Sequence, residues 1–217
     1  MRRRPGFGGA LLDAAVAVAV AVKLYPALLL PAALRRRPVL VGRAATAVVA
    51  VAYLPHVLAV GPRVLGYLPG YLREEHYEGG GRFVLLGMVG LSGVAATVVA
   101  VLLLTATVVA VLRSDPAAVP VTVAALWTVG AALLVANPAQ PWYSILLVAL
   151  AVIEGRPEWL AVAIAAYPTY FTALLMGRRL DWSGGASYAA AAVLVLVATV
   201  ARNQNRRVSA ARGTQGR

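Results

Sequence analysis

The chain has no cysteine, so it forms no disulfide and offers no thiol for catalysis or for binding a metal. It has little charge, because charged residues make up 13% of its 217 residues, and only eight of these are acidic. Its two histidines and eight acids show no metal-ligand spacing that we recognise. We therefore expect neither a metal nor a cofactor.

Apolar sequence is what the chain has in abundance. Hydrophobic residues make up 61% of it, and several apolar runs reach or approach the roughly 20 residues with which a helix crosses about 30 Å of hydrocarbon. Alanine, valine and leucine follow one another without the period-two alternation of a membrane β-barrel. This pattern predicts an all-α fold, a polytopic transmembrane helical bundle in the cell (plasma) membrane.

The net charge of +12 comes from arginines that gather at the ends of apolar runs, in Arg2 to Arg4, Arg35 to Arg37 and Arg202 to Arg212. Positive residues mark the cytoplasmic ends of spans, so topology explains the basic balance and we expect no nucleic-acid partner. We predict one transmembrane domain over residues 1–201. Residues 202–217 are then a cytoplasmic basic tail without regular structure.

Residues 8–34 have the length of one span, but Lys23 and Pro26 interrupt them and arginine runs lie at both ends. If both runs are cytoplasmic, two short helices at 8–22 and 27–34 form a re-entrant hairpin. Its non-helical tip then needs surrounding protein or a water-filled cavity. The alternative is one kinked span with the N-terminus outside.

The apolar runs that follow predict about six crossings in addition to the hairpin. They cover residues 39–61, 84–112, 117–136, 144–153, 159–176 and 187–201. In this topology the polar stretch 62–82 faces outward. The stretch from Asn137 to Tyr143 also faces outward, and its Trp142-Tyr143 pair is typical of a membrane interface.

Lys23 is the first candidate site residue, because an ionisable group within an apolar run is costly and marks a functional site by default. At the tip of a hairpin its ammonium could pair with an anionic lipid phosphate. The alternative is that its side chain extends to the nearest interface.

The outer stretch offers Glu74, Glu75 and His76 as a general base, as substrate contacts or as solvated loop residues. Adjacent residues do not share a helix face, so their spacing does not decide among these roles. Tyr71 and its neighbouring tyrosines fit either an aromatic belt or a wall on which a sugar stacks.

Three motifs follow one another along the chain. They are Lys23-Leu24-Tyr25-Pro26; then Gly66 to Tyr71 with Glu74-Glu75 and Gly81-Arg82-Phe83; then Pro141-Trp142-Tyr143. In this order they resemble, over about residues 8–200, the C-terminal half of bacterial GT-C glycosyltransferases, and among these the polyprenol-phosphate-mannose-dependent mannosyltransferases. The resemblance implies a multispanning enzyme with an outward active site, which moves a sugar from a polyprenyl phosphate donor to a lipid-linked or glycan acceptor.

The resemblance also implies roles for individual residues. Lys23 and Arg82 would contact the donor phosphate, and the substrate loop would contain Tyr71, Arg73, Glu74, Glu75 and His76. In that superfamily the catalytic acid lies in the first outer loop, and no acid of this chain matches it. We therefore expect the chain to be part of such an enzyme and not to catalyse transfer alone, with its catalytic residue unknown.

A second hypothesis is a membrane protein without catalytic activity that binds or scaffolds a lipid-linked saccharide pathway. A transporter is less favoured, because we find no inverted repeat and few intramembrane charges beyond Lys23.

Overall fold

The computed structural model describes residues 25–66, 68, 70, 82–176 and 182–215. The described residues form helices and connecting turns, without a strand, which confirms the all-α prediction. The elements, with 3-10 helices written η, are η1 (Tyr25–Leu29), α2 (Leu30–Leu34), α3 (Pro38–Val60), η2 (Gly61–Leu65), α5 (Val84–Met88), α6 (Gly93–Arg113), α7 (Val121–Ala136), η3 (Pro141–Ser144), α8 (Ile145–Ile153), η4 (Pro157–Trp159), α9 (Leu160–Met176) and α10 (Trp182–Gln215).

Three described helices are long and apolar enough to cross a membrane: α3, α6 and the Gly184–Asn205 part of α10. This supports the membrane assignment. The apolar helices α7 and α8 have 16 and 9 residues, fewer than the roughly 20 of a full crossing. Six crossings therefore stay a prediction.

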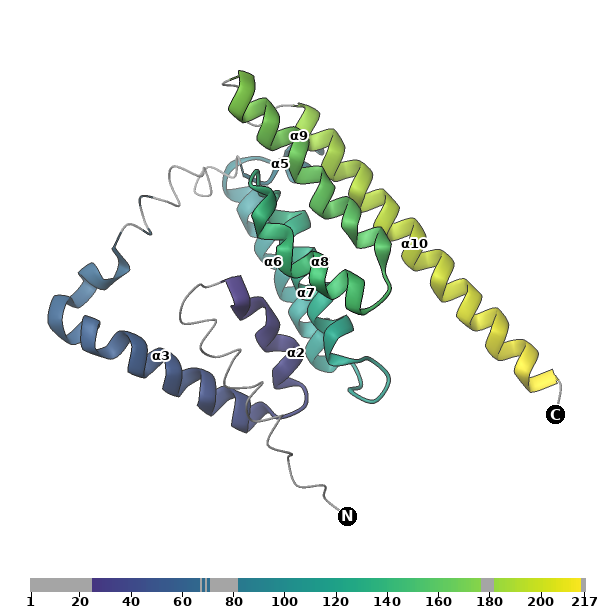
Figure 1. Cartoon of the computed structure of the whole chain (residues 1–217), viewed down its shortest axis with the longest axis horizontal. Coiled ribbons are helices and arrows are strands. Elements are labelled where there is room, and N and C mark those ends of the chain that lie inside the picture. Colours follow the sequence, from purple (N-terminus) through teal and green to yellow (C-terminus); the bar gives the residue numbers. More distant parts are fainter. Residues whose placement is uncertain (1–24, 67, 69, 71–81, 177–181, 216–217) are drawn as a thin grey trace, which may run out of the picture.

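Helix α7 lies at the centre of the bundle, between α2, α6 and α8 (Figure 1). Its buried side chains point to several neighbours, as expected for a helix that is apolar on all sides. Gly130 admits the closest contact, because a Cβ built there would lie 2.0 Å from a ring carbon of Trp159. The indole of Trp159 therefore occupies the space that any larger residue at position 130 would need.

Helices α9 and α10 pack side by side along one flank of the bundle (Figure 1). Small residues bring their backbones together: a Cβ on Gly184 would lie 2.4 Å from the Thr169 hydroxyl, and Ser187 Oγ donates to the Ala165 carbonyl at 2.9 Å. Small side chains at close helix contacts are common in membrane proteins, where packing replaces the hydrophobic driving force.

Helix α3 stands apart from the bundle (Figure 1). Its residues 51–60 are all exposed, and Val41 near its first turn is its buried residue. The exposed side chains are mainly apolar, so acyl chains of lipid are the solvent that suits them.

Polar contacts gather at one end of the bundle. Arg35 donates to the Ser114 hydroxyl and, at 2.6 Å, to the Val119 carbonyl. Nearby, Thr122 donates to Glu154, and Arg202 pairs with the buried Glu158 at 2.9 Å. Two of the arginine clusters that we assign to the cytoplasmic side therefore lie at the same end. We call this the arginine end.

Two expectations differ from the structure. The expected helix over 84–112 breaks between Met88 and Gly93, where Gly90 and Gly93 have φ of 84° and 55°, values that end a regular helix. The tail expected to lack regular structure is helical, since α10 continues to Gln215. Its alanine, arginine and glutamine residues favour helix, and extending an existing helix needs no new nucleus.

The second limb of the expected hairpin is helical over Tyr25–Leu34. This limb runs antiparallel to α7. Arg35, after its end, hydrogen-bonds to Val119, just before α7 begins, while Leu28, near its start, accepts a hydrogen bond from Thr128 in the middle of α7. The first limb and the Lys23 tip lie outside the described residues, so the hairpin itself stays a prediction.

Candidate functional site

Asn137 ends α7 and organises the other end of the bundle. It has left-handed φ and ψ of 45° and 56°, which asparagine tolerates better than most residues. Its backbone N–H donates to the Leu133 carbonyl at 2.9 Å, and Nδ2 donates to the Leu134 carbonyl at 2.8 Å. Because the residue is fully buried, these bonds form away from water and fix the direction of the chain.

The remaining polar atom of Asn137 reaches a distant segment. Its Oδ1 accepts from the Leu85 backbone N–H at 3.2 Å, one of the donors that the start of α5 leaves without an intrahelical partner. The contact holds Arg82 and Phe83, which precede α5, beside the end of α7. Both side chains are buried, Arg82 with 5% of its surface exposed.

The opposite wall comes from η1. Thr128 in α7 donates to the Leu28 carbonyl at 2.7 Å, which fastens η1 along α7. Tyr25 then packs edge-on against Tyr143 of η3, with ring centroids 6.3 Å apart. Tyr188 of α10 donates to the Pro138 carbonyl at 2.6 Å and steadies the turn between these elements.

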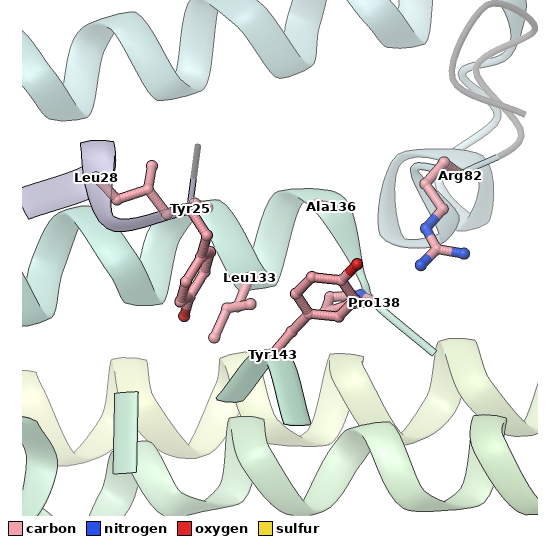
Figure 2. A pocket seen from close by; sticks show the side chains of 8 residues that line it. Tyr25, Leu28, Arg82, Leu133, Ala136, Pro138 and Tyr143 are labelled. Atoms are coloured by element: carbon pink, nitrogen blue, oxygen red, sulfur yellow. The ribbon is translucent and has the colours of Figure 1, made fainter. Parts of the chain in front are cut away.

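These elements line a half-open cavity of about 180 Å³. Figure 2 shows Arg82 on one side of it and Tyr25 with Leu28 on the other, with Pro138 and Tyr143 between them. The cavity is smaller than the roughly 300–1,000 Å³ of sites for drug-sized ligands, so it fits a single compact group. The lining residues are Tyr25, Leu28, Arg82, Ala132, Leu133, Ala136, Pro138 and Tyr143.

The lining combines one cation with tyrosine rings and apolar side chains. The guanidinium of Arg82 already interacts within the protein. The Tyr25 hydroxyl is buried and has no hydrogen-bond partner among the described residues. A tyrosine hydroxyl is protonated at neutral pH, so it is available as a donor.

A buried hydroxyl without a partner costs about 1–3 kcal/mol. Because the Tyr25 hydroxyl has almost no accessible surface, a ligand oxygen would recover that cost once the side chain turns toward the cavity. An arginine charge in apolar surroundings attracts anions more strongly than it does in water. The arrangement therefore suits a small anionic group with several oxygens, attached to an apolar chain. None of the eight lining residues is acidic.

Of the predicted site residues, Arg82 lines this cavity. The others lie outside the described residues: Lys23, Tyr71, Arg73, Glu74, Glu75 and His76. The described residues contain no group of three or more histidines and acids placed to hold a metal ion.

No site role was predicted for Tyr25, Tyr143 or Asn137. The available signal was an Asn-Pro pair directly after an apolar run, which suggests a left-handed helix end followed by a turn. No sequence spacing relates Leu85 to Asn137, 52 residues away.

No protein-family model, curated protein or solved structure matches this chain. The likeness to the glycosyltransferases therefore rests on the motifs quoted above.

Proposed function

We propose that this chain binds a polyprenyl-phosphate sugar donor, as the membrane part of a glycosyltransferase of the mannosyltransferase type. The observation that carries the proposal is the cavity in which Arg82 and Tyr25 lie at opposite sides of an apolar lining. Lys23 is proposed as a second cation for the same phosphate, and the loop with Tyr71, Arg73, Glu74, Glu75 and His76 as its substrate loop.

The chemistry of the lining supports a lipid-linked phosphate. Arginine presents several N–H donors in a fork that matches the oxygens of a phosphate, and the tyrosine hydroxyl can donate one bond more. A cavity of about 180 Å³ takes a phosphate with the first carbons of its chain, while the remaining chain extends into the bilayer. A soluble phosphate would gain nothing from the leucine and alanine side chains of the wall.

The position of the cavity supports access from the outer leaflet. It lies at the C-terminal end of α7, and the arginine end lies at the start of that helix. If the arginine end is cytoplasmic, the cavity faces the outer side of the plasma membrane. About six crossings and a re-entrant hairpin belong to the same proposal.

A second candidate is a protein without catalytic activity that binds or scaffolds lipid-linked saccharides. The described lining residues include no carboxylate, which favours this candidate, because a general base must come within about 2.6–3.2 Å of the acceptor hydroxyl. Transfer by the enzyme would need a carboxylate from another segment.

A binding measurement tests the shared step. We expect the purified chain in detergent micelles to bind a short-chain polyprenyl phosphate. Arg82→Gln should weaken that binding about tenfold to hundredfold, since a hydrogen bond to a charged group is worth about 1.5–3 kcal/mol. Arg36→Gln removes the same charge at an exposed position of the arginine end and should leave the affinity unchanged. Tyr25→Phe keeps the ring and should weaken binding about twofold to tenfold.

Equal affinities of the wild-type chain and Arg82→Gln would contradict the phosphate role. Inorganic phosphate bound as tightly as the lipid would contradict the role of the apolar wall. A transfer assay separates the two candidates: with an acidic outer-loop segment co-expressed, the enzyme moves mannose to an acceptor, and the binding protein does not. Transfer by the 217-residue chain alone would assign the base to its own acids, with Glu74→Gln and Glu75→Gln as the variants to test.

A further inference from the structure

Four aromatic side chains form a patch on the flank of the bundle. Trp142 of η3 packs edge-on against Tyr170 of α9, with ring centroids 5.8 Å apart. Tyr170 contacts Phe171 at 5.7 Å, and Tyr167 contacts Phe171 at 6.1 Å. We call these four residues the aromatic patch.

The aromatic patch is exposed although its members contact one another. The exposed fractions of Trp142, Tyr167 and Phe171 are 54%, 47% and 49%. Tryptophan and tyrosine have an apolar ring with a polar atom at one edge, and they concentrate where lipid headgroups meet hydrocarbon. The region where headgroups meet hydrocarbon would solvate both the apolar ring and the polar atom of each tryptophan and tyrosine of the patch.

Helix α10 gives the distance from the patch to the arginine end. Gly184 lies against Thr169, the residue before Tyr170, and Arg202 pairs with Glu158. Arg202 comes 18 residues after Gly184, which corresponds to about 27 Å of α10. Its side chain reaches back to Glu158, which precedes Thr169 by 11 residues, roughly 17 Å of helix. The length of α10 from Gly184 to Arg202 is close to the roughly 30 Å of hydrocarbon in a bilayer.

The surface between these two levels is apolar. Val193, Leu194, Leu196 and Val197 of α10 are exposed there, with fractions between 50% and 64%. The aromatic patch at the level of Gly184, the apolar band of α10 and the Arg202–Glu158 ion pair thus follow one another along the flank that α9 and α10 form. This is the order that a bilayer imposes on a helix that crosses it.

We infer that the aromatic patch lies in the phospholipid headgroup region of the bilayer surface opposite the arginine end, and that it sets the depth of the chain in the membrane. Trp142 precedes Tyr143, which lines the cavity, so the cavity lies at the level of lipid phosphates. The inference concerns membrane geometry and holds whether or not the cavity binds a polyprenyl phosphate.

Spin labels at introduced cysteines test this depth, because the chain has no cysteine of its own. A nitroxide at Phe171→Cys reports on the patch, and one at Val193→Cys reports on the apolar band. In phosphatidylcholine vesicles, relative collision rates with oxygen and with a water-soluble nickel chelate give the depth of each label. Val193 comes nine residues after Gly184, so we expect its label to lie about 13 Å deeper than the label at 171.

Labels of equal depth, or a label at 171 as accessible to nickel as one in water, would overturn the inference. Native Trp142 provides a second measurement in case Phe171→Cys disturbs the fold. The fluorescence lost in Trp142→Phe should be quenched more by lipids brominated near the headgroup than by lipids brominated near the chain end. Quenching by neither lipid, together with a spectral shift on adding soluble mannose oligosaccharide, would instead assign the patch to sugar stacking.

Discussion

Replacing Asn137 should weaken both the bundle and the cavity, because this residue joins them. Asn137→Gly keeps access to the left-handed conformation but removes the side-chain bonds to Leu85 and Leu134. At about 0.5–1.5 kcal/mol for each bond, the expected loss of unfolding free energy is about 1–3 kcal/mol. Asn137→Ala loses the same bonds but, unlike the glycine variant, keeps a Cβ in the left-handed region, so we expect it to be about 1–2 kcal/mol less stable than Asn137→Gly.

The measurement is the free energy of unfolding in mixed micelles titrated with sodium dodecyl sulfate. Asn203→Ala serves as the matched control, because Asn203 is exposed on α10 and the exchange removes the same amide. We expect that control to change stability by less than about 0.5 kcal/mol. Short-chain polyprenyl phosphate binding is measured on the same proteins, since loss of the Leu85 contact should displace Arg82.

Two outcomes would refute this reasoning. Equal stability of the glycine and alanine variants would show that the left-handed conformation contributes no strain. An Asn137→Gly protein as stable as the wild-type chain would show that the two side-chain bonds do not hold the end of α7 to α5. Normal ligand affinity in a destabilised variant would show that the bonds of Asn137 stabilise the bundle but do not position Arg82 for binding.

Two further perturbations address packing and topology. Gly130→Ala should destabilise the bundle by about 1–3 kcal/mol in the same detergent titration, because its Cβ would meet the Trp159 ring at 2.0 Å. The control is Gly42→Ala in α3, where an added Cβ has nothing within 4 Å, and we expect it to be neutral or slightly stabilising. Equal effects at the two glycines would contradict the packing reading. For topology, we expect Gly80→Cys to react with a membrane-impermeant thiol reagent on whole cells and Ser209→Cys to react only after lysis. The opposite pattern would reverse the orientation.

Helix positions were largely predictable, because membrane helices need continuous apolar runs. The expected span over 39–61 matches α3 at Pro38–Val60, and the expected 159–176 matches α9 at Leu160–Met176. The break after Met88 was not predicted, since Gly90 and Gly93 are also tolerated inside membrane helices. The helical end of α10 was missed because low hydrophobicity was interpreted as disorder, although its residues favour helix.

The cavity was predictable only in part. Arg82 was a candidate because the resemblance to the glycosyltransferases implied a contact with the donor phosphate, but its neighbours come from η1, α7 and η3. Contacts such as Leu85 to Asn137 and Thr128 to Leu28 join segments 52 and 100 residues apart. They depend on tertiary packing, which a single sequence does not encode as a local pattern.

The separation of α3 from the bundle affects which parts of the sequence can diverge during evolution. Where a helix packs against neighbours, each substitution must fit a particular shape, as at Gly130 beneath Trp159. The residues of the stretch 51–60 of α3 are all exposed, so lipid solubility is the main demand on most of their side chains. Many apolar sequences meet that demand, so α3 can drift widely in sequence while the residues around α7 stay nearly fixed.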